Sequence, residues 1–230
     1  MIPKIIHYCW FGKNKKSPLI ESCIASWKKL CPDYTLIEWN EESFDVASHP
    51  FTRSMYEKRR FAFVADYVRL VALEHHGGVY LDTDMLLVQS LAPLLNTQLL
   101  LGKESEKYIS CGMIGAVAHH PFIETMKKEY DTLQEPVANP VIMTALYEKM
   151  HPTECTVMSP EAFYPFDAHH IKDYHGQNLG SQVYGVHLWN YSWGHPLNKF
   201  FKKIGVYRIG KKIVEILGIK KIMKRLLGFV

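Results

Sequence analysis

The residues with the clearest chemical potential are Asp82 and Asp84, which stand one residue apart inside an apolar, strand-forming run at 77–88. Two carboxylates in a sequence that otherwise predicts a buried strand cost several kcal/mol unless a counter-charge compensates them. A hard divalent cation takes oxygen ligands and can also bind phosphates, so one such ion could compensate both carboxylates. The alternative is a strand end whose acids face solvent, and a lone Asp-x-Asp does not decide between the two.

A second polar pair, Asp66 and Arg69, precedes the double glycine Gly77-Gly78. Residues three apart share one face of a helix, so these two side chains can form an ion pair. One interpretation is a structural salt bridge, which contributes about 0.3–0.5 kcal/mol when exposed. The other is a buried pair that hydrogen-bonds the hydroxyl groups of a polar ligand.

Aromatic and polar residues gather at two further places. Trp10 follows the opening strand, where ligands of α/β sheets collect, and can either stack on a flat ring or fill the core. Late in the chain, His187 ends a predicted strand and is either a metal ligand or a core histidine. Ser192 and Trp193 close by can donate hydrogen bonds to a diphosphate or pack as ordinary residues.

The elements that position these residues follow an α/β pattern. Residues 4–9 and 34–39 predict strands around a helix at 18–30, which Ser17 caps, and this is the unit of a parallel sheet. A helix at 59–76 ends at the double glycine. Further strands are predicted at 99–103, 110–116, 156–160 and 182–188, and helices at 121–133 and 140–150.

Composition indicates a globular protein. The 230 residues suit one domain with a substantial core, and 47% hydrophobic and 22% charged residues are ordinary for a soluble chain. Five cysteines without a C-x-x-C pair argue against a disulfide framework or a zinc site and favour a reducing cytosol. The first residues lack the build of a signal peptide, and no apolar run reaches the roughly 18–20 residues that span a bilayer. We therefore expect a cytoplasmic protein.

Three blocks in order, at residues 2–12, 65–69 and 77–84, closely resemble the DXD-containing glycosyltransferases related to yeast initiating α-1,6-mannosyltransferases and to bacterial capsular and lipopolysaccharide sugar transferases. The catalytic domains of clostridial glucosylating toxins are more distantly similar. The resemblance covers residues 1–95 and, more weakly, 187–193. It implies a GT-A fold, with a Rossmann-like single mixed sheet flanked by helices, in a catalytic domain at 1–198.

The resemblance also implies roles for individual residues. The enzyme would be a metal-dependent retaining hexosyltransferase with a nucleotide-sugar donor, UDP-sugars being favoured over GDP-mannose, and a saccharide or lipid-linked acceptor in surface polysaccharide synthesis. Mn²⁺ or Mg²⁺ would bind Asp84, with His187 or Asn190 as further ligands. The donor-binding residues would be Trp10 on the nucleobase, Asp66, Arg69 and Asp82 on the sugar side, and Ser192 and Trp193 on the diphosphate.

Residues 199–230 differ in charge from the rest of the chain. They hold ten Lys or Arg and one acid, a net charge of +9, whereas 17 basic and 22 acidic residues give 1–198 a net charge of −5. Apolar residues recur there at helical spacing, which predicts a basic amphipathic helical tail. Binding to an anionic membrane, at the inner face of the plasma membrane, is favoured over simple docking on the body. Nucleic acid is disfavoured, because the body offers no supporting basic face.

Two other functions remain open at this point. A phosphatase of the haloacid dehalogenase type also places Asp-x-Asp at a strand end, but its motif lies on the opening strand and continues to Thr or Val, where this chain has Leu86. A membrane-associated sugar-binding protein with an inactive site is the non-enzymatic alternative. Release of nucleoside diphosphate would indicate the glycosyltransferase, and release of free phosphate would indicate the phosphatase. Release of neither product would indicate the sugar-binding protein.

Overall fold

The computed structural model describes residues 1–133 and 137–190. The chain divides into two units, Met1–Trp189 and Asn190–Val230, and the following description concerns the first of them. The tail at 199–230 and the predicted domain boundary at 198 lie outside the described residues, so both stay predictions.

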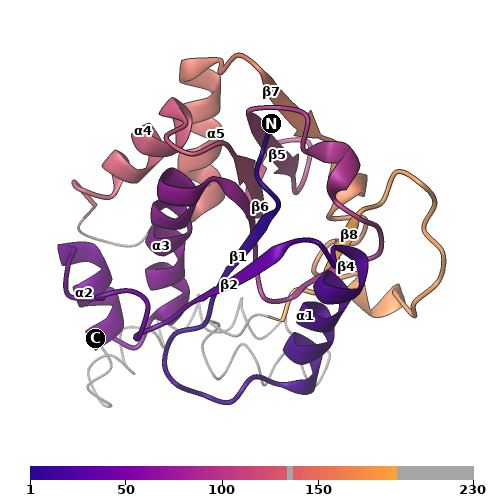
Figure 1. The fold of residues 1–230 in the computed structure, drawn as a ribbon, viewed down its shortest axis with the longest axis horizontal. Helices are drawn as coiled ribbons and strands as arrows, with labels where there is room; N and C mark the ends of the chain where they lie inside the picture. Colours follow the sequence, from indigo (N-terminus) through magenta and orange to yellow (C-terminus); the bar gives the residue numbers. More distant parts are fainter. Residues whose placement is uncertain (134–136, 191–230) are drawn as a thin grey trace, which may run out of the picture. The chain divides into compact units, whose positions relative to one another are not determined.

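A six-stranded mixed sheet forms the centre of this unit, in the order β2-β1-β3-β6-β5-β7 (Figure 1). The parallel pairs are β1 with β2, β1 with β3 and β5 with β7, whereas β6 is antiparallel to both β3 and β5. All strands except β6 therefore run in the same direction and end at the same edge of the sheet. The strands are β1 (Ile5–Cys9), β2 (Thr35–Trp39), β3 (Gly78–Leu81), β5 (Leu99–Lys103), β6 (Ile109–Ala116) and β7 (Cys155–Met158).

Helices cover both faces of the sheet, as Figure 1 shows. One hydrophobic core joins α2 (Pro50–Glu57), α3 (Phe61–His76), α4 (Pro121–Glu129) and α5 (Asn139–Met150) to one face, and a second core joins α1 (Pro18–Leu30) to the other. Because side chains alternate along a strand, β3 contributes Tyr80 to the first core and Val79 and Leu81 to the second. Among the described residues there are also three short 3₁₀ helices: η1 (Ala92–Leu94), η2 (Pro160–Ala162) and η3 (Ile171–Asp173).

A second, two-stranded sheet pairs β4 (Met85–Leu87) with β8 (Gly185–His187) in antiparallel register. Helix α1 holds it: the Trp27 indole N–H donates to the Met85 carbonyl at 2.7 Å, and the Leu87 N–H donates to Ser26 Oγ at 3.0 Å. The run at 77–88 is thus two strands, with the Asp-x-Asp at the break between them. This small sheet also brings the late strand next to the motif.

The sequence predicted most of these elements. The α/β fold class is confirmed, and the helix at 18–30 is observed as Pro18–Leu30, with Ser17 Oγ accepting the Ile20 N–H at 3.4 Å. Helix α2 was not predicted, and β4–β8 adds a small sheet to the single mixed sheet that was expected. The helix predicted at 121–133 ends at Glu129, and the late strand at 182–188 is only Gly185–His187.

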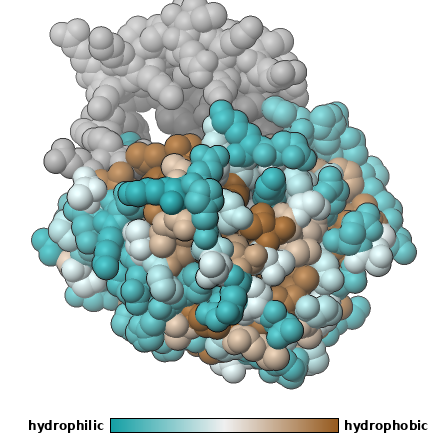
Figure 2. Space-filling model, turned by 90° about the horizontal axis from the view of Figure 1, so that it is seen from above, coloured by the Kyte–Doolittle hydropathy of each residue, from teal (hydrophilic) through white to brown (hydrophobic). Residues whose placement is uncertain are grey.

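The surface of the described residues carries few large apolar side chains. Those exposed are Met1, Leu19, Val137 and Val141, and Figure 2 shows apolar residues interspersed with hydrophilic ones on the face in view. In the described part of the chain, no helix has both the length and the apolar character needed to cross a bilayer.

Buried His7 on β1 fixes the start of the strand that leads to the Asp-x-Asp. The Trp39 indole N–H donates to His7 Nδ1 at 3.1 Å, and an indole nitrogen can only donate. His7 Nδ1 is therefore the acceptor, so Nε2 carries the hydrogen and donates to the Gly77 carbonyl at 2.8 Å. The neighbouring Gly78 has a φ of +105°, and a Cβ there would lie 2.8 Å from the Ile5 carbonyl oxygen.

This network predicts a loss of stability in acid. Burial lowers the pKa of His7 from 6.5 to about 4, so the fold favours the neutral ring. The stabilisation is complete above pH 6.5 and is lost as the pH falls towards 4, because the unfolded chain then binds the extra proton. Between pH 7 and 4.5 the loss from His7 should be about 2–3 kcal/mol, given 1.36 kcal/mol per pKa unit.

Urea unfolding of the wild type and of His7→Gln at the two pH values measures this loss. The variant keeps an amide donor for the Gly77 carbonyl and cannot titrate, so its stability should fall less than that of the wild type by that amount. Equal losses in the two proteins would show that His7 does not carry the effect.

Candidate functional site

The two aspartates occupy the turn between β3 and β4. The Asp82 N–H donates to the Gly112 carbonyl on β6 at 2.8 Å, and the Met85 N–H donates to the Asp82 carbonyl at 2.9 Å. The Leu188 N–H donates to the Asp84 carbonyl at 2.9 Å. The backbone on both sides of the motif is therefore fixed before any ligand arrives, and both carboxylates lie at the edge where β1, β3 and β5 end.

His187, the last residue of β8, faces both carboxylates. Its Nε2 lies 3.2 Å from Asp84 Oδ1 and 3.8 Å from Asp82 Oδ2, and the ligand atoms of the three residues lie within 4.8 Å of one another. The ring packs edge-on against Trp189, with centroids 4.5 Å apart, and tilted against Tyr164 at 5.3 Å. Its buried Nδ1 has no hydrogen-bond partner among the described residues.

Arg69 on α3 joins three elements at this site. Its Nη2 donates to Asp66 Oδ1 at 2.7 Å and lies 3.4 Å from Asp82 Oδ1, while Nη1 donates to the Cys111 carbonyl on β6. The arginine is only 5% exposed. The predicted ion pair between Asp66 and Arg69 therefore forms and is buried next to the Asp-x-Asp, and hydrogen bonding of this pair to a ligand stays a prediction. These contacts hold the carboxylates of Asp66 and Asp82 in place and compensate part of their charge.

Tyrosines complete the surroundings of Asp82. The Tyr80 hydroxyl donates to Asp82 Oδ1 at 3.1 Å, and the Arg69 guanidinium lies 4.5 Å from the Tyr80 ring centre. On the other side, a Cβ at Gly112 would lie 2.8 Å from Asp82 Oδ2 and 2.7 Å from the Tyr164 hydroxyl. Gly112 therefore provides the space in which these two groups approach each other.

The charged groups of the site shift the pKa values of Asp66 and His187. Burial raises the pKa of Asp66 to about 6, which the Arg69 guanidinium opposes and the Asp82 carboxylate reinforces. Burial alone would lower the pKa of His187, but the two carboxylates beside it raise that pKa to about 10. Each acid is thus held beside a cation that compensates part of its charge.

The residues present fit a divalent metal ion. Asp82, Asp84 and His187 offer two carboxylates and an imidazole, a mixed oxygen and nitrogen set that suits Mn²⁺ more closely than Mg²⁺. A charged His187 already compensates the two acids through its Nε2, so a metal ion would take over a position that the fold prepares for positive charge.

Trp10 lies at the same edge of the sheet. The register pairs His7 of β1 with Tyr80 of β3, so Trp10 follows the end of β1 beside the motif that follows β3. Its indole N–H donates to the Asn14 carbonyl at 2.7 Å, and Lys16 Nζ lies 5.6 Å from its ring. The ring is half-buried, which leaves part of its surface available, and its role as a nucleobase platform stays a prediction.

The predicted C-terminal block is described only in part. Asn190 is the last described residue and belongs to the second unit, and Ser192 and Trp193 lie outside the described residues. Their predicted roles are untested. Asp66, Arg69, Asp82, Asp84 and His187 are the predicted residues that the structure brings together.

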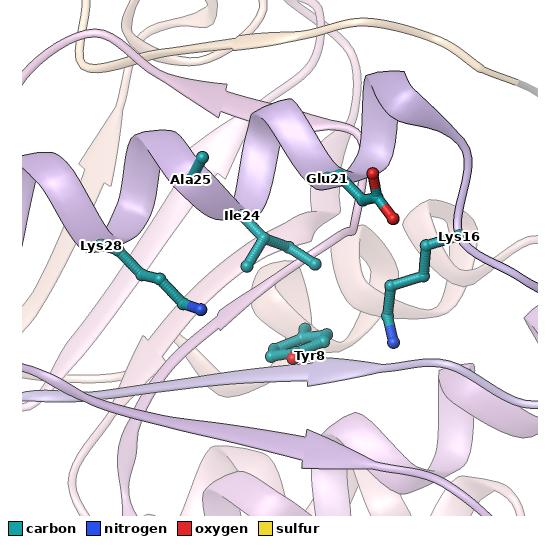
Figure 3. A pocket seen from close by; sticks show the side chains of 6 residues that line it. All are labelled: Tyr8, Lys16, Glu21, Ile24, Ala25 and Lys28. Carbon is teal, nitrogen blue, oxygen red and sulfur yellow. The ribbon is translucent and has the colours of Figure 1, made fainter.

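A groove of about 290 Å³ lies between α1 and β1 (Figure 3). Tyr8 forms its floor and Ile24 faces it from α1, while Lys16 and Glu21 stand at its side. Neither acid of the Asp-x-Asp lines it. The groove shares Lys16 with the surroundings of Trp10 and is separate from the metal-binding candidates.

A mixed α/β sheet with paired acids at its carboxyl edge occurs in several classes of protein, and the comparisons with known proteins indicate the glycosyltransferases. Residues 18–101 match the glycosyltransferase sugar-binding region containing the DXD motif, and residues 118–204 match the α1,4-glycosyltransferase conserved region. The chain therefore carries two sequence regions typical of glycosyltransferases, and the first of them contains the Asp-x-Asp.

Relatives of this chain act on several sugars according to their names. A mannosyl phosphorylinositol ceramide synthase of Saccharomyces cerevisiae is 33% identical over 53% of this chain and 33% of its own length. Human α1,4-N-acetylglucosaminyltransferase is 24% identical over 71% and 50%, and mouse lactosylceramide 4-α-galactosyltransferase is 26% identical over 71% and 48%. The chain thus spans a third to a half of the length of these relatives.

Solved structures support the fold. The PaToxG glycosyltransferase superposes with a TM-score of 0.53 at 18% identity, covering 65% of this chain and 70% of that one. The glycosyltransferase domain of the YGT toxin superposes with a TM-score of 0.52 at 11% identity, covering 73% and 83%.

Sequence reasoning missed the support around the motif. Tyr80, Gly112 and Tyr164 all approach Asp82, although none was predicted as a site residue. A signal existed for Gly112, because a glycine inside a predicted strand often marks a close approach of other groups. Tyr164 carries no comparable signal, since it reaches the site from a segment without regular structure.

Because Arg69 contacts both Asp66 and Asp82, we expect its replacement to reduce the free energy of unfolding strongly. Arg69→Met keeps much of the side-chain volume but leaves Asp66 and Asp82 without their buried cation, which should cost about 3–5 kcal/mol. Arg53→Met on α2 is the matched control, because Arg53 is exposed and should change stability by about 0.5 kcal/mol or less. Urea unfolding measures both, and similar small losses in the two variants would contradict this role of Arg69.

Proposed function

We propose that this protein is a metal-dependent, retaining glycosyltransferase that moves a hexose from a nucleotide-sugar to a saccharide or lipid-linked saccharide in surface polysaccharide synthesis. The observation that carries the proposal is the convergence of Asp82, Asp84 and His187 at the carboxyl edge of a GT-A sheet, with Arg69 and Asp66 beside them. The family matches give the reaction class, and the geometry supports the site.

Each residue has a proposed part in binding the donor. Asp84 and His187 hold the metal ion, with Asn190 as a further ligand, and Ser192 and Trp193 donate to the diphosphate. Trp10 stacks on the nucleobase at the β1 end of the edge. Asp66 accepts hydrogen bonds from sugar hydroxyls, and Arg69 orients Asp66 through the contact between Nη2 and Oδ1 at 2.7 Å.

The reaction transfers the anomeric carbon from a phosphate oxygen to an acceptor hydroxyl. A bound divalent ion would neutralise the negative charge that grows on the departing diphosphate. The acceptor oxygen attacks from the face that the phosphate leaves, which retains configuration, and its proton passes to a leaving phosphate oxygen. This route needs no carboxylate nucleophile, and Asp82 is suited to orientation instead, because Tyr80 and Arg69 hold its Oδ1.

The first test is a thermal-shift panel of UDP- and GDP-sugars with and without Mn²⁺. A ligand at about one hundred times its dissociation constant adds roughly 2.7 kcal/mol of stability, which raises the melting temperature measurably. We expect one nucleotide class, UDP-sugars, to stabilise the wild type only with Mn²⁺, and Asp84→Asn to abolish the shift. Asp173→Asn in exposed η3 is the matched control and should behave as the wild type.

Product analysis separates the alternatives. Release of nucleoside diphosphate supports a transferase, whereas release of free phosphate would favour the phosphatase. Donor binding without any turnover would favour the inactive sugar-binding protein. A well-folded wild type that no nucleotide-sugar stabilises would contradict the proposed donor site.

Membrane binding by the basic tail is a further part of the proposal. Residues 199–230 carry a net charge of +9, and each basic residue near an anionic bilayer such as the cytoplasmic leaflet contributes about 1 kcal/mol. The yeast and mouse relatives are named after ceramide-containing lipids, which supports the proposal of an acceptor held at a membrane.

Vesicle sedimentation of the full chain tests this part. Replacing four tail lysines by Gln should release the protein from vesicles of phosphatidylglycerol and phosphatidylcholine, whereas four exposed lysines of the body replaced in the same way should leave binding intact. Equal binding by both variants would contradict a tail-specific interaction. The tail set is Lys211, Lys212, Lys220 and Lys221, and the body set is Lys13, Lys15, Lys29 and Lys58.

A further inference from the structure

Glu104 lies just beyond the end of β5, as Asp82 lies just beyond the end of β3, and it stands one residue further along its strand, because Leu101 and Tyr80 both pair with Ile114. It directly follows Lys103, the last residue of β5, as Asp82 directly follows Leu81. Since β6 is antiparallel to both strands, β3 and β5 are parallel and end at the same edge. One strand separates them, so the two backbones lie about 10 Å apart, a distance that two acidic side chains can largely bridge.

Glu104 brings a further negative charge to the neighbourhood of the candidate site. It is half-buried, and it interacts electrostatically with both Asp82 and His187. Its backbone N–H donates to the Tyr108 carbonyl at 3.0 Å, which fixes the turn between β5 and β6. Its carboxylate oxygens can accept hydrogen bonds from hydroxyl groups of a ligand.

Glu104 and Trp10 lie on opposite sides of the Asp-x-Asp. In the strand order β1-β3-β6-β5, Trp10 follows β1 and Glu104 follows β5, with Asp82 between them. In the proposed function the nucleotide lies on the Trp10 side and the sugar reaches the motif. The acceptor must then approach the anomeric carbon from the β5 side, where Glu104 stands.

We propose that Glu104 is an acceptor-positioning residue, whose carboxylate accepts hydrogen bonds from hydroxyl groups of a neutral, polyhydroxylated acceptor ring. The inference rests on the proposed function, since it places the acceptor relative to a donor sugar. The reaction balance is unchanged: the bond from the acceptor oxygen to the anomeric carbon forms, the bond to phosphate breaks, and the proton leaves with the phosphate. Glu104 takes no net proton.

The charge of the neighbourhood gives the class of acceptor. Arg69 and His187 compensate Asp82 and Asp84, whereas Glu104 adds a carboxylate on the β5 side, so a phosphate or carboxylate on the acceptor ring would meet a like charge there. Hydroxyl groups meet hydrogen-bond acceptors instead. Neutral glycosides should therefore be used in preference to glycosides that carry an anionic group on the reacting ring.

The experiment measures transfer from the nucleotide-sugar that stabilises the wild type. Lactose and methyl α-mannoside serve as neutral acceptors, with mannose 6-phosphate and a methyl glucuronide as anionic ones. We expect Glu104→Gln and Glu104→Ala to raise the acceptor KM at least tenfold, with a smaller change in kcat. In both variants a larger share of the donor should be hydrolysed by water instead of transferred to the acceptor. Glu106→Gln, two residues further along the same turn and exposed, should stay within twofold of the wild type.

The outcomes are distinguishable. An unchanged acceptor KM in the Glu104 variants, a preference for the anionic acceptors, or donor turnover that no neutral glycoside stimulates would overturn the inference alone. Loss of the thermal shift with donor and Mn²⁺ in Glu104→Gln would also overturn it, because the residue would then serve the donor side. A wild type that binds no nucleotide-sugar would overturn the proposed function, and this inference with it.

Discussion

The buried guanidinium of Arg69 holds together three parts of the chain that are distant in sequence. It contacts Asp66 on its own helix, the Cys111 carbonyl on β6 and Asp82 after β3. Carboxylates at the end of a buried strand are costly without a counter-charge, and Arg69 supplies one from the helix side while His187 supplies one from β8. The acids can therefore stay close together at the edge of the sheet.

The small sheet explains how a late segment takes part. Pairing of β4 with β8 sets Met85 opposite His187, so the histidine lies next to the aspartates although about one hundred residues separate them. Helix α1 fixes β4 through Trp27 and Ser26, which makes the first helix a support for the site as well as a cover for the sheet. The fold thus positions the metal-binding candidates through backbone pairing rather than through flexible side chains.

Local patterns were sufficient for the parts of the structure that depend on local interactions. The cap and apolar spacing of α1, the glycine stop of α3 and the Asp-x-Asp itself could be predicted from neighbouring residues. The pairing of β4 with β8, the antiparallel direction of β6 and the approach of Tyr164 to Asp82 depend on contacts between distant segments, and one sequence carries little information about these. Glu104 shows the same limit, because its relation to Asp82 requires the strand order.

The central proposition is that Asp84 and His187 hold a divalent ion that carries a nucleoside diphosphate. The most direct measurement is an anomalous difference map from crystals of the full chain grown with Mn²⁺ and UDP, with data collected at the manganese absorption edge. The account predicts one strong peak between the Asp84 carboxylate and His187 Nε2, with diphosphate density extending from it towards Trp10. A well-ordered Mn²⁺ and diphosphate bound elsewhere, with Asp84 and His187 still in mutual contact, would contradict it.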